Sequence, residues 1–262
     1  MLWIVVTSPS FFSGEAGFLH RLIACGADYI HLRKPGATKE DCSRLLDMMH
    51  GEDLRHIITH DFFEFAGQYG LHGIHLNSRC SHIPEGYHGH ISRSCHSLED
   101  VVKYKDACDY VFLSPIFDSI SKHGYASAFN DNTLKDASAR GIIDNKVVAL
   151  GGVTPDRTDY LKSLHFGGAA MLGCVNRLAR LPEDMQEEMM KDIRKRMNDI
   201  YIYRCKTLDM HTYDVKTRDV QTVADCLPHC RRQPVFRFCQ VQAPTSPTKA
   251  ENNQTGISTE YE

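Results

Sequence analysis

Two features are missing from the sequence: a long hydrophobic run and a large charge of either sign. No apolar run approaches the roughly 18 residues that a membrane helix requires. The opening residues, MLWIVVTSPSFF, carry no basic n-region and no long apolar core of the kind found in secretory signal peptides. With 30 Lys+Arg against 33 Asp+Glu, the net charge of −3 argues against a nucleic-acid-binding surface. We therefore expect a cytoplasmic protein whose partners are neither nucleic acids nor membranes.

Cysteines at a clear metal-binding spacing are missing as well. The chain has 10 cysteines, but no two form a CxxC pair. The closest two, Cys226 and Cys230 with His229 between them, make a poor zinc pattern. Because no export signal is present, we expect reduced thiols.

What the sequence does contain is a series of short apolar runs rich in β-branched and aromatic residues. Such runs are typical of parallel strands that are buried on both faces, and most of the segments between them have helical spacing. The runs lie at residues 3–6, 29–32, 56–59, 73–76, 90–93, 110–113, 146–150 and 169–172. Eight strand–helix units predict an α/β protein with a closed (β/α)8 TIM barrel.

Local signals mark several helix starts and the end of the barrel. Thr38 and Ser97 are suited to capping helix N-termini, and Pro155 is suited to a first helical position. The last barrel helix is expected at about 183–198, so that the barrel spans residues 1–198. Residues 199–262 are polar, show no strand–helix rhythm and are predicted to be a largely disordered, irregular C-terminal extension.

In such barrels the chemistry lies at the carboxyl ends of the strands. The loops after strands 7 and 8, which usually hold a phosphate in this fold, carry Gly151, Gly152 and Gly173. These glycines predict phosphate binding, and the alternative is that they only form tight turns.

Cations are also frequent at the expected strand ends, where they would attract a small anionic ligand or else form a solvated rim. They are Arg33, Lys34, Arg79, Arg93 and Lys122.

Asp61 is the lone carboxylate placed where a divalent cation could bind. A single carboxylate is a poor magnesium site unless substrate phosphates complete it. Of the histidines expected near the mouth, His31 and His60 could act as acid or base, whereas His75, within strand 4, is expected to be packed or hydrogen-bonded inside the barrel.

Read in order, these strand ends resemble one known family, the thiamine phosphate synthase/TenI superfamily. The segments that carry the resemblance are YIHLRKPG (29–36), THDFFEFA (59–66), GIHLNSR (73–79), SRSCHSLED (92–100), DYVFLSPIFDSISK (109–122), VVALGGVT (147–154) and HFGGAAMLG (165–173). The resemblance covers the chain to about residue 198 and implies a (β/α)8 barrel. A synthase of this family couples hydroxymethylpyrimidine diphosphate to a thiazole phosphate and releases diphosphate, with Mg²⁺ holding the leaving group.

The resemblance also implies roles for individual residues in thiamine biosynthesis. The catalytic candidates are Lys122, His31 and Arg33, and Asp61 matches a Mg²⁺ ligand. The candidates for contacts with the small phosphate and diphosphate substrates are His60, Ser94, Ser119, Ser121, Gly151, Gly152, Leu172 and Gly173. A homo-oligomer is left open.

Some positions depart from the synthase pattern. Cys80 stands where a second magnesium-binding Asp is expected, so Mg²⁺ binding should be weak. His31 and His60 replace the usual Gln and Asn, which is closer to the TenI branch of thiazole tautomerases. Yet Pro115 stands where a tautomerase has its catalytic His. A synthase is therefore the first hypothesis, and the alternatives are a tautomerase or a barrel that binds a thiazole or thiamine phosphate without turnover.

Overall fold

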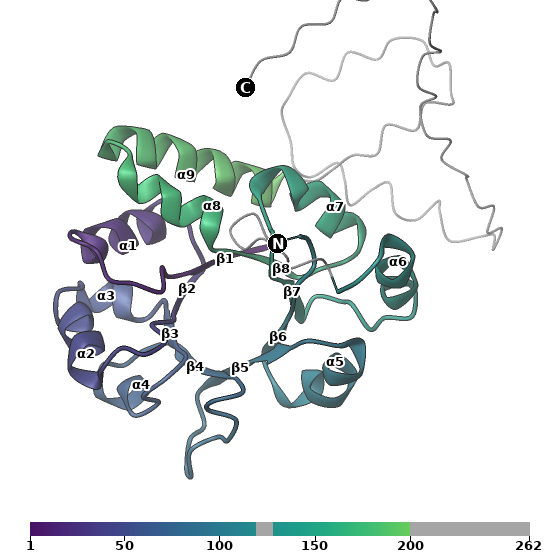
Figure 1. The fold of residues 1–262 in the computed structure, drawn as a ribbon, viewed down its shortest axis with the longest axis horizontal. Helices are drawn as coiled ribbons and strands as arrows, with labels where there is room; N and C mark the ends of the chain where they lie inside the picture. The colour runs from purple at the N-terminus through teal and green to yellow at the C-terminus, as the bar shows by residue number, and fades with distance from the viewer. Residues whose placement is uncertain (119–127, 200–262) are drawn as a thin grey trace, which may run out of the picture. The chain divides into compact units, whose positions relative to one another are not determined.

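A closed barrel of eight parallel strands forms the core of the protein (Figure 1). The computed structural model describes residues 1–118 and 128–199. The strands pair in sequence order and β8 closes the ring on β1. They are β1 (Leu2–Val6), β2 (Tyr29–Leu32), β3 (Ile57–Thr59), β4 (Gly73–Leu76), β5 (His90–Cys95), β6 (Tyr110–Leu113), β7 (Val147–Ala149) and β8 (Gly168–Met171). The predicted TIM barrel is confirmed.

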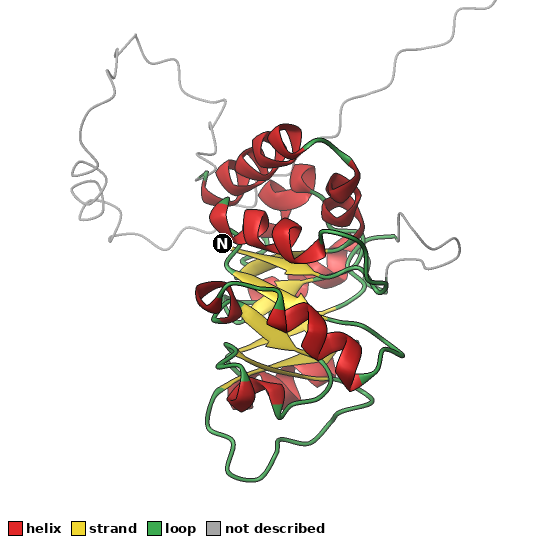
Figure 2. Ribbon diagram, turned by 90° about the vertical axis from the view of Figure 1, so that its left-hand side faces the viewer, coloured by secondary structure: helices red, strands yellow, loops and turns green. Residues whose placement is uncertain are grey.

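Helices surround the strands on the outside (Figures 1 and 2). The α-helices are α1 (Glu15–Ala24), α2 (Lys39–Asp47), α3 (Gly51–Leu54), α4 (Phe65–Gln68), α5 (Leu98–Tyr104), α6 (Asp131–Ala139), α7 (Thr158–Ser163), α8 (Gly173–Asn176) and α9 (Glu183–Asn198). Short 3-10 turns add η1 (Lys105–Ala107), η2 (Pro155–Arg157) and η3 (Arg177–Arg180).

The capping signals act as predicted. The Thr38 side chain accepts a hydrogen bond from the Asp41 N–H at the start of α2, and the Ser97 side chain accepts one from the Asp100 N–H at the start of α5. Pro155 occupies the first position of η2, where its missing N–H removes no helical hydrogen bond.

One strand–helix unit departs from the regular pattern, because the chain between β4 and β5 forms a loop. Residues 77–89 contain no helix in the structure. This segment includes Pro84, Gly86 and Gly89 and has no apolar stripe, so it cannot cover the barrel as a helix would.

Strand residues alternate between two apolar cores. Side chains such as Trp3, Val5, Ile30 and Leu32 point outward and pack under the helices. A second, interior cluster fills the barrel and is formed by Ile4, Val6, Ile58, Tyr110, Phe112, Val148 and Ala170, with Leu172 packed against it. The barrel is therefore a packed core whose open face for ligands lies at the strand ends.

The last helix of the described residues lies where the sequence predicts it. Helix α9 is 16 residues long and buries Met190, Ile193 and Met197 against the outer core. Residues 200–262, which include nearly all of the predicted tail, lie outside the described residues. No helix in the described parts of the chain is long and apolar enough to cross a membrane.

Candidate active site at the carboxyl ends of the strands

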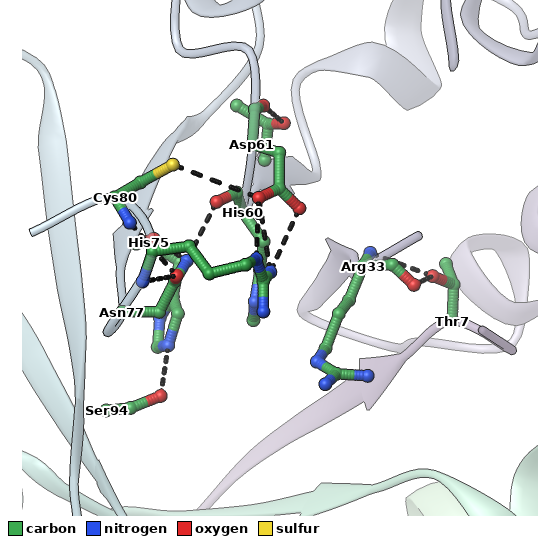
Figure 3. Close-up of polar contacts among 10 residues, drawn as sticks. Thr7, Arg33, His60, Asp61, His75, Asn77, Cys80 and Ser94 are labelled. Carbon is green, nitrogen blue, oxygen red and sulfur yellow. Dashed lines mark hydrogen bonds and ion pairs between the residues drawn. The ribbon is translucent and has the colours of Figure 1, made fainter. Parts of the chain in front are cut away.

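The polar residues after β3 and β4 meet in one cluster (Figure 3). The Arg79 guanidinium donates from Nε and Nη2 to Asp61 Oδ1, at 3.2 and 3.1 Å, and from Nη2 to Asp61 Oδ2 at 3.1 Å. Cys80 Sγ lies 3.8 Å from Asp61 Oδ1 as a weak donor. Both oxygens of the predicted metal-binding carboxylate are therefore engaged by protein donors.

Asn77 fixes the loop that presents Arg79 and Cys80. Its Oδ1 accepts hydrogen bonds from the backbone N–H groups of Arg79 and Cys80, at 2.9 and 3.2 Å. Its Nδ2 donates to the carbonyl oxygens of His60 and His75, at 2.8 and 3.2 Å. One side chain thus ties the β4 loop to the end of β3, and this holds Arg79 beside Asp61.

The donor set at Asp61 fits a resident Mg²⁺ poorly. Magnesium requires oxygen ligands at about 2.1 Å in octahedral geometry and is usually held by one or two carboxylates. Here the single carboxylate faces an arginine, and the neighbouring side chain is the thiol of Cys80, which suits softer metals. Burial raises the pKa of that thiol, which disfavours the thiolate form that binds metals.

Arg33, at the end of β2, supplies a second cation to the same end of the barrel. Its backbone N–H donates to Thr7 Oγ1 at 2.9 Å, and Thr7 Oγ1 donates to the Arg33 carbonyl at 3.2 Å. Its guanidinium makes no hydrogen bond or ion pair within the described residues (Figure 3). Burial and then the charge of Arg79 lower the pKa of Arg33, while Asp61 raises it.

The structure corrects the placement of His31. The sequence predicts this residue at the mouth, but it lies within β2 and is fully buried in the barrel interior. Its Nδ1 is hydrogen-bonded to His60 Nε2 at 2.9 Å, and its Nε2 to the Tyr110 hydroxyl at 2.6 Å. His60, directly after β3, is also buried, so a catalytic role for either histidine stays a prediction.

The interior histidines are held in the neutral form. Burial and then the neighbouring histidines lower the pKa of His31 well below the usual range. Burial also lowers the pKa of His60 well below that range, followed by the nearby histidines and the charges of Arg33 and Arg79. Burial also lowers the pKa of His75 to about 3. As expected, His75 is packed inside the barrel, hydrogen-bonded to the hydroxyls of Ser92 and Ser94 at 2.8 Å each. Ser94, a predicted diphosphate contact, therefore lies next to the interior network.

Two predicted cations of the mouth are engaged elsewhere. Lys34 is buried, and its Nζ pairs with Glu15 Oε1 of α1 at 2.6 Å. The Arg93 guanidinium lies 3.9 Å from the ring centre of Tyr104 in α5, on the outside of the barrel. The prediction that Lys34 and Arg93 attract a ligand at the mouth is therefore wrong, because Lys34 is paired with a carboxylate and Arg93 points outward.

The predicted phosphate loops lie at the ends of β7 and β8. Gly151 and Gly152 have φ values of +92° and +62°, and a Cβ on Gly152 would lie 2.4 Å from the Asp118 carbonyl oxygen. These glycines therefore allow the β7 loop to approach the β6 loop. Gly173 begins α8, and Leu172 before it packs on the interior core. Phosphate binding there stays a prediction.

Three predicted site residues, Ser119, Ser121 and Lys122, lie outside the described residues. Two residues that organise the site, Asn77 and Tyr110, are not among those that the sequence predicts for it. Asn77 directly follows β4, and Tyr110 begins β6. No local signal in the sequence shows that the Tyr110 hydroxyl would reach His31.

Comparisons with known proteins give a family and a fold. A family model described as thiamine monophosphate synthase matches residues 3–175, which extend from β1 into α8. A thiamine phosphate pyrophosphorylase from Bacteroides thetaiotaomicron has a similar structure, with 38% identity and a TM-score of 0.68, covering 75% of this chain and 97% of that one. No curated protein matches the sequence.

More distant structures share the fold alone. A thiamine phosphate pyrophosphorylase from Pyrococcus furiosus has 18% identity and a TM-score of 0.60, covering 75% of this chain and 95% of that one. A tryptophan synthase alpha-subunit mutant from the same organism has 14% identity and a TM-score of 0.51, covering 75% and 96%.

Proposed function

Because the chain belongs to the thiamine monophosphate synthase family, we propose that it is a thiamine phosphate synthase. The reaction joins hydroxymethylpyrimidine diphosphate to a thiazole phosphate. The bond between the pyrimidine methylene carbon and the diphosphate oxygen breaks, and its electron pair leaves with diphosphate. The lone pair of the thiazole nitrogen then forms the new C–N bond. The step requires no proton transfer, so positioning and charge stabilisation supply the catalysis.

The observation that carries this proposal is the presence of two separate sets of candidate anion-binding groups. Arg33 and Arg79 follow β2 and β4, whereas Gly151, Gly152 and Gly173 follow β7 and β8 across the ring. A synthase holds two phosphorylated substrates at once, whereas a tautomerase holds a single thiazole phosphate. Two sets therefore favour the coupling reaction, with the arginines facing the diphosphate and the glycine loops facing the thiazole phosphate.

A second candidate function, thiazole phosphate tautomerisation, is favoured by the His31–His60 contact. Two neutral imidazoles that share a hydrogen bond can relay a proton, because one ring nitrogen can accept a proton while another donates one and neither ring has to stay charged. Only one of the two reactions depends on such a proton transfer, so variants of these histidines distinguish them.

The test is a coupling assay with both substrates, followed by chromatography of thiamine phosphate. We expect product with the wild-type protein and a loss of about tenfold or more with Arg33→Gln, because a charge-assisted contact to the diphosphate is removed. Arg140→Gln is the matched control, since Arg140 pairs with Asp136 on the exposed face of α6.

Two other outcomes would favour the alternatives. Absence of product from micromolar protein, together with tautomer conversion that His60→Asn abolishes, would establish the tautomerase instead. Saturable binding of thiazole phosphate without either reaction would establish a non-catalytic binder.

A further inference from the structure

Arg79 occupies the side of Asp61 on which a divalent cation would need to bind. Its Nε and Nη2 contact both carboxylate oxygens, and Cys80 takes a further contact to Oδ1. A cation that used both oxygens of Asp61 as ligands would first have to displace this guanidinium. The second carboxylate that would compensate for that displacement is replaced by Cys80.

The position of Arg79 is fixed by its backbone as well as by its side chain. Asn77 accepts from the Arg79 N–H at 2.9 Å and donates to the His60 carbonyl at 2.8 Å. The guanidinium is therefore placed by one backbone contact and by a forked contact to Asp61. Its Nη1 makes no hydrogen bond within the described parts of the chain, so one edge of the planar group is available to a ligand.

Arg33 and Arg79 together carry more positive charge than Asp61 neutralises. Arg33 follows β2 and Arg79 follows β4, the two strands that flank β3, so both cations lie at the same end of the barrel around Asp61. In agreement with that placement, the charge of Arg79 contributes to lowering the pKa of Arg33. The Arg33 guanidinium has no ion-pair partner in residues 1–118 and 128–199. An anion that contacts both groups would relieve the repulsion between the two like charges, and phosphate oxygens match the forked donors of arginine.

We infer that Arg79, held by Asp61, takes the place of the divalent cation, and that a diphosphate group binds between Arg33 and Arg79 without a metal ion. The identity of that group as the substrate's leaving diphosphate rests on the proposed function. Arg79 contacts the diphosphate, and Asp61 is a positioning residue that aims the guanidinium. As the C–O bond breaks, the two guanidiniums receive the charge that develops on the diphosphate.

The test is calorimetric titration of the full-length protein with inorganic pyrophosphate, in EDTA and in millimolar Mg²⁺. We expect saturable binding in EDTA that added Mg²⁺ does not strengthen, because the site needs no metal and Mg²⁺ competes for pyrophosphate in solution. Arg79→Gln should weaken binding in EDTA about ten- to hundredfold, because one charge-assisted forked contact is removed. Arg140→Gln, which changes an exposed arginine paired with Asp136, should leave the affinity unchanged.

The Asp61→Asn variant distinguishes two roles for Asp61, as a residue that positions Arg79 or as a ligand of a metal ion. If Asp61 only aims Arg79, the substitution should weaken pyrophosphate binding in EDTA less than Arg79→Gln does, because both arginines are retained. The melting temperature should change little, since the Asp61–Arg79 pair is partly exposed and such pairs contribute little to stability. Pyrophosphate binding that requires Mg²⁺, is abolished by Asp61→Asn and tolerates Arg79→Gln would overturn the inference.

This experiment does not depend on turnover, so the two proposals can fail separately. Metal-free pyrophosphate binding without thiamine phosphate formation would retain the anion site and reject the synthase. Coupling activity that is lost in EDTA, together with pyrophosphate binding only in Mg²⁺, would retain the synthase and reject the metal-free site.

Discussion

His31 Nδ1 lies 2.9 Å from His60 Nε2 in the interior of the barrel, where both side chains are almost completely shielded from solvent. One of the two nitrogens donates and the other accepts, so the contact requires at least one neutral ring. Tyr110 binds the other nitrogen of His31. These hydrogen-bonded side chains therefore connect the end of β3 to the start of β6.

Acid should destabilise the fold through these histidines. Burial lowers the pKa of His31, His60 and His75 in the folded state, to about 3 for His75, whereas an unfolded histidine titrates near 6.5. Between these values the unfolded state binds more protons, so stability rises with pH and falls as the pH drops below about 6.5. Each histidine that stays neutral in the folded state contributes about 2 kcal/mol to the free energy of unfolding that is lost between pH 6.5 and 5. Urea unfolding at a series of pH values measures this slope.

The variant for that series is His75→Gln, which should reduce the slope by one proton because burial lowers the pKa of His75 to about 3. A slope unaffected by His75→Gln would mean that His75 is protonated in the folded state.

Removing the Tyr110 hydroxyl should cost stability although the ring remains. In Tyr110→Phe, the buried His31 Nε2 loses its partner at 2.6 Å, and an unsatisfied buried polar atom costs about 1–3 kcal/mol. For a barrel of this size each kcal/mol lowers the melting temperature by about 2–4 °C. Tyr69→Phe is the control, since it removes an exposed hydrogen bond to Asp47. Equal melting temperatures for the two variants would argue against the buried hydrogen bond.

The barrel was predictable because its signals are local. Eight short apolar runs separated by helical segments can close only as a parallel barrel, and caps such as Thr38 act on residues three positions away. The missing helix between β4 and β5 follows from the same local reasoning, as Pro84 and the glycines around it interrupt any helical pattern.

The site was less predictable because it depends on which way each side chain points and on contacts between loops. Strands buried on both faces show no polar alternation, so the sequence could not tell that His31 points inward and Arg93 outward. Likewise, Asp61 and Arg79 were each placed correctly at strand ends. Their pairing depends on side-chain geometry across two loops, which no spacing in the chain encodes.

The buried Lys34–Glu15 pair should be far more sensitive to substitution than a surface pair. Both side chains are almost completely buried, with Nζ and Oε1 2.6 Å apart. Glu15→Gln would leave the lysine charge without its partner, which costs about 3–5 kcal/mol. The double variant Glu15→Leu/Lys34→Met should be less destabilised than Glu15→Gln, because it removes both charges.

Chemical denaturation of these variants measures the free energy of unfolding. Glu187→Gln, which breaks the exposed ion pair with Lys191, is the control and should produce no measurable change. If the double variant is as unstable as Glu15→Gln, the cost lies in packing and not in the unpaired charge.

Substitution of Gly152 should lower both stability and activity, because an added Cβ would clash with the loop after β6. Gly141 also has a positive φ but has no such clash, so it serves as the control. Gly152 has φ +62°, and an added Cβ would lie 2.4 Å from the Asp118 carbonyl oxygen and 2.8 Å from Phe117 Cβ. Gly141 has a similar φ of +70°, but its Cβ would meet nothing within 4 Å. Both alanine variants carry the backbone cost of about 1–2 kcal/mol. Gly152→Ala adds an overpacking cost of about 1–3 kcal/mol.

Measurements of kcat/KM distinguish Gly152→Ala from Gly141→Ala further. The contacts of Gly152 fall on Phe117 and Asp118, which immediately precede the segment that carries Ser119, Ser121 and Lys122. Gly152→Ala must shift that backbone, so kcat/KM of the coupling reaction should fall even at temperatures where the variant is fully folded. Gly141→Ala, in the turn after α6, should retain wild-type kcat/KM. Equal losses of activity in both variants would mean that Gly152 acts only through global stability.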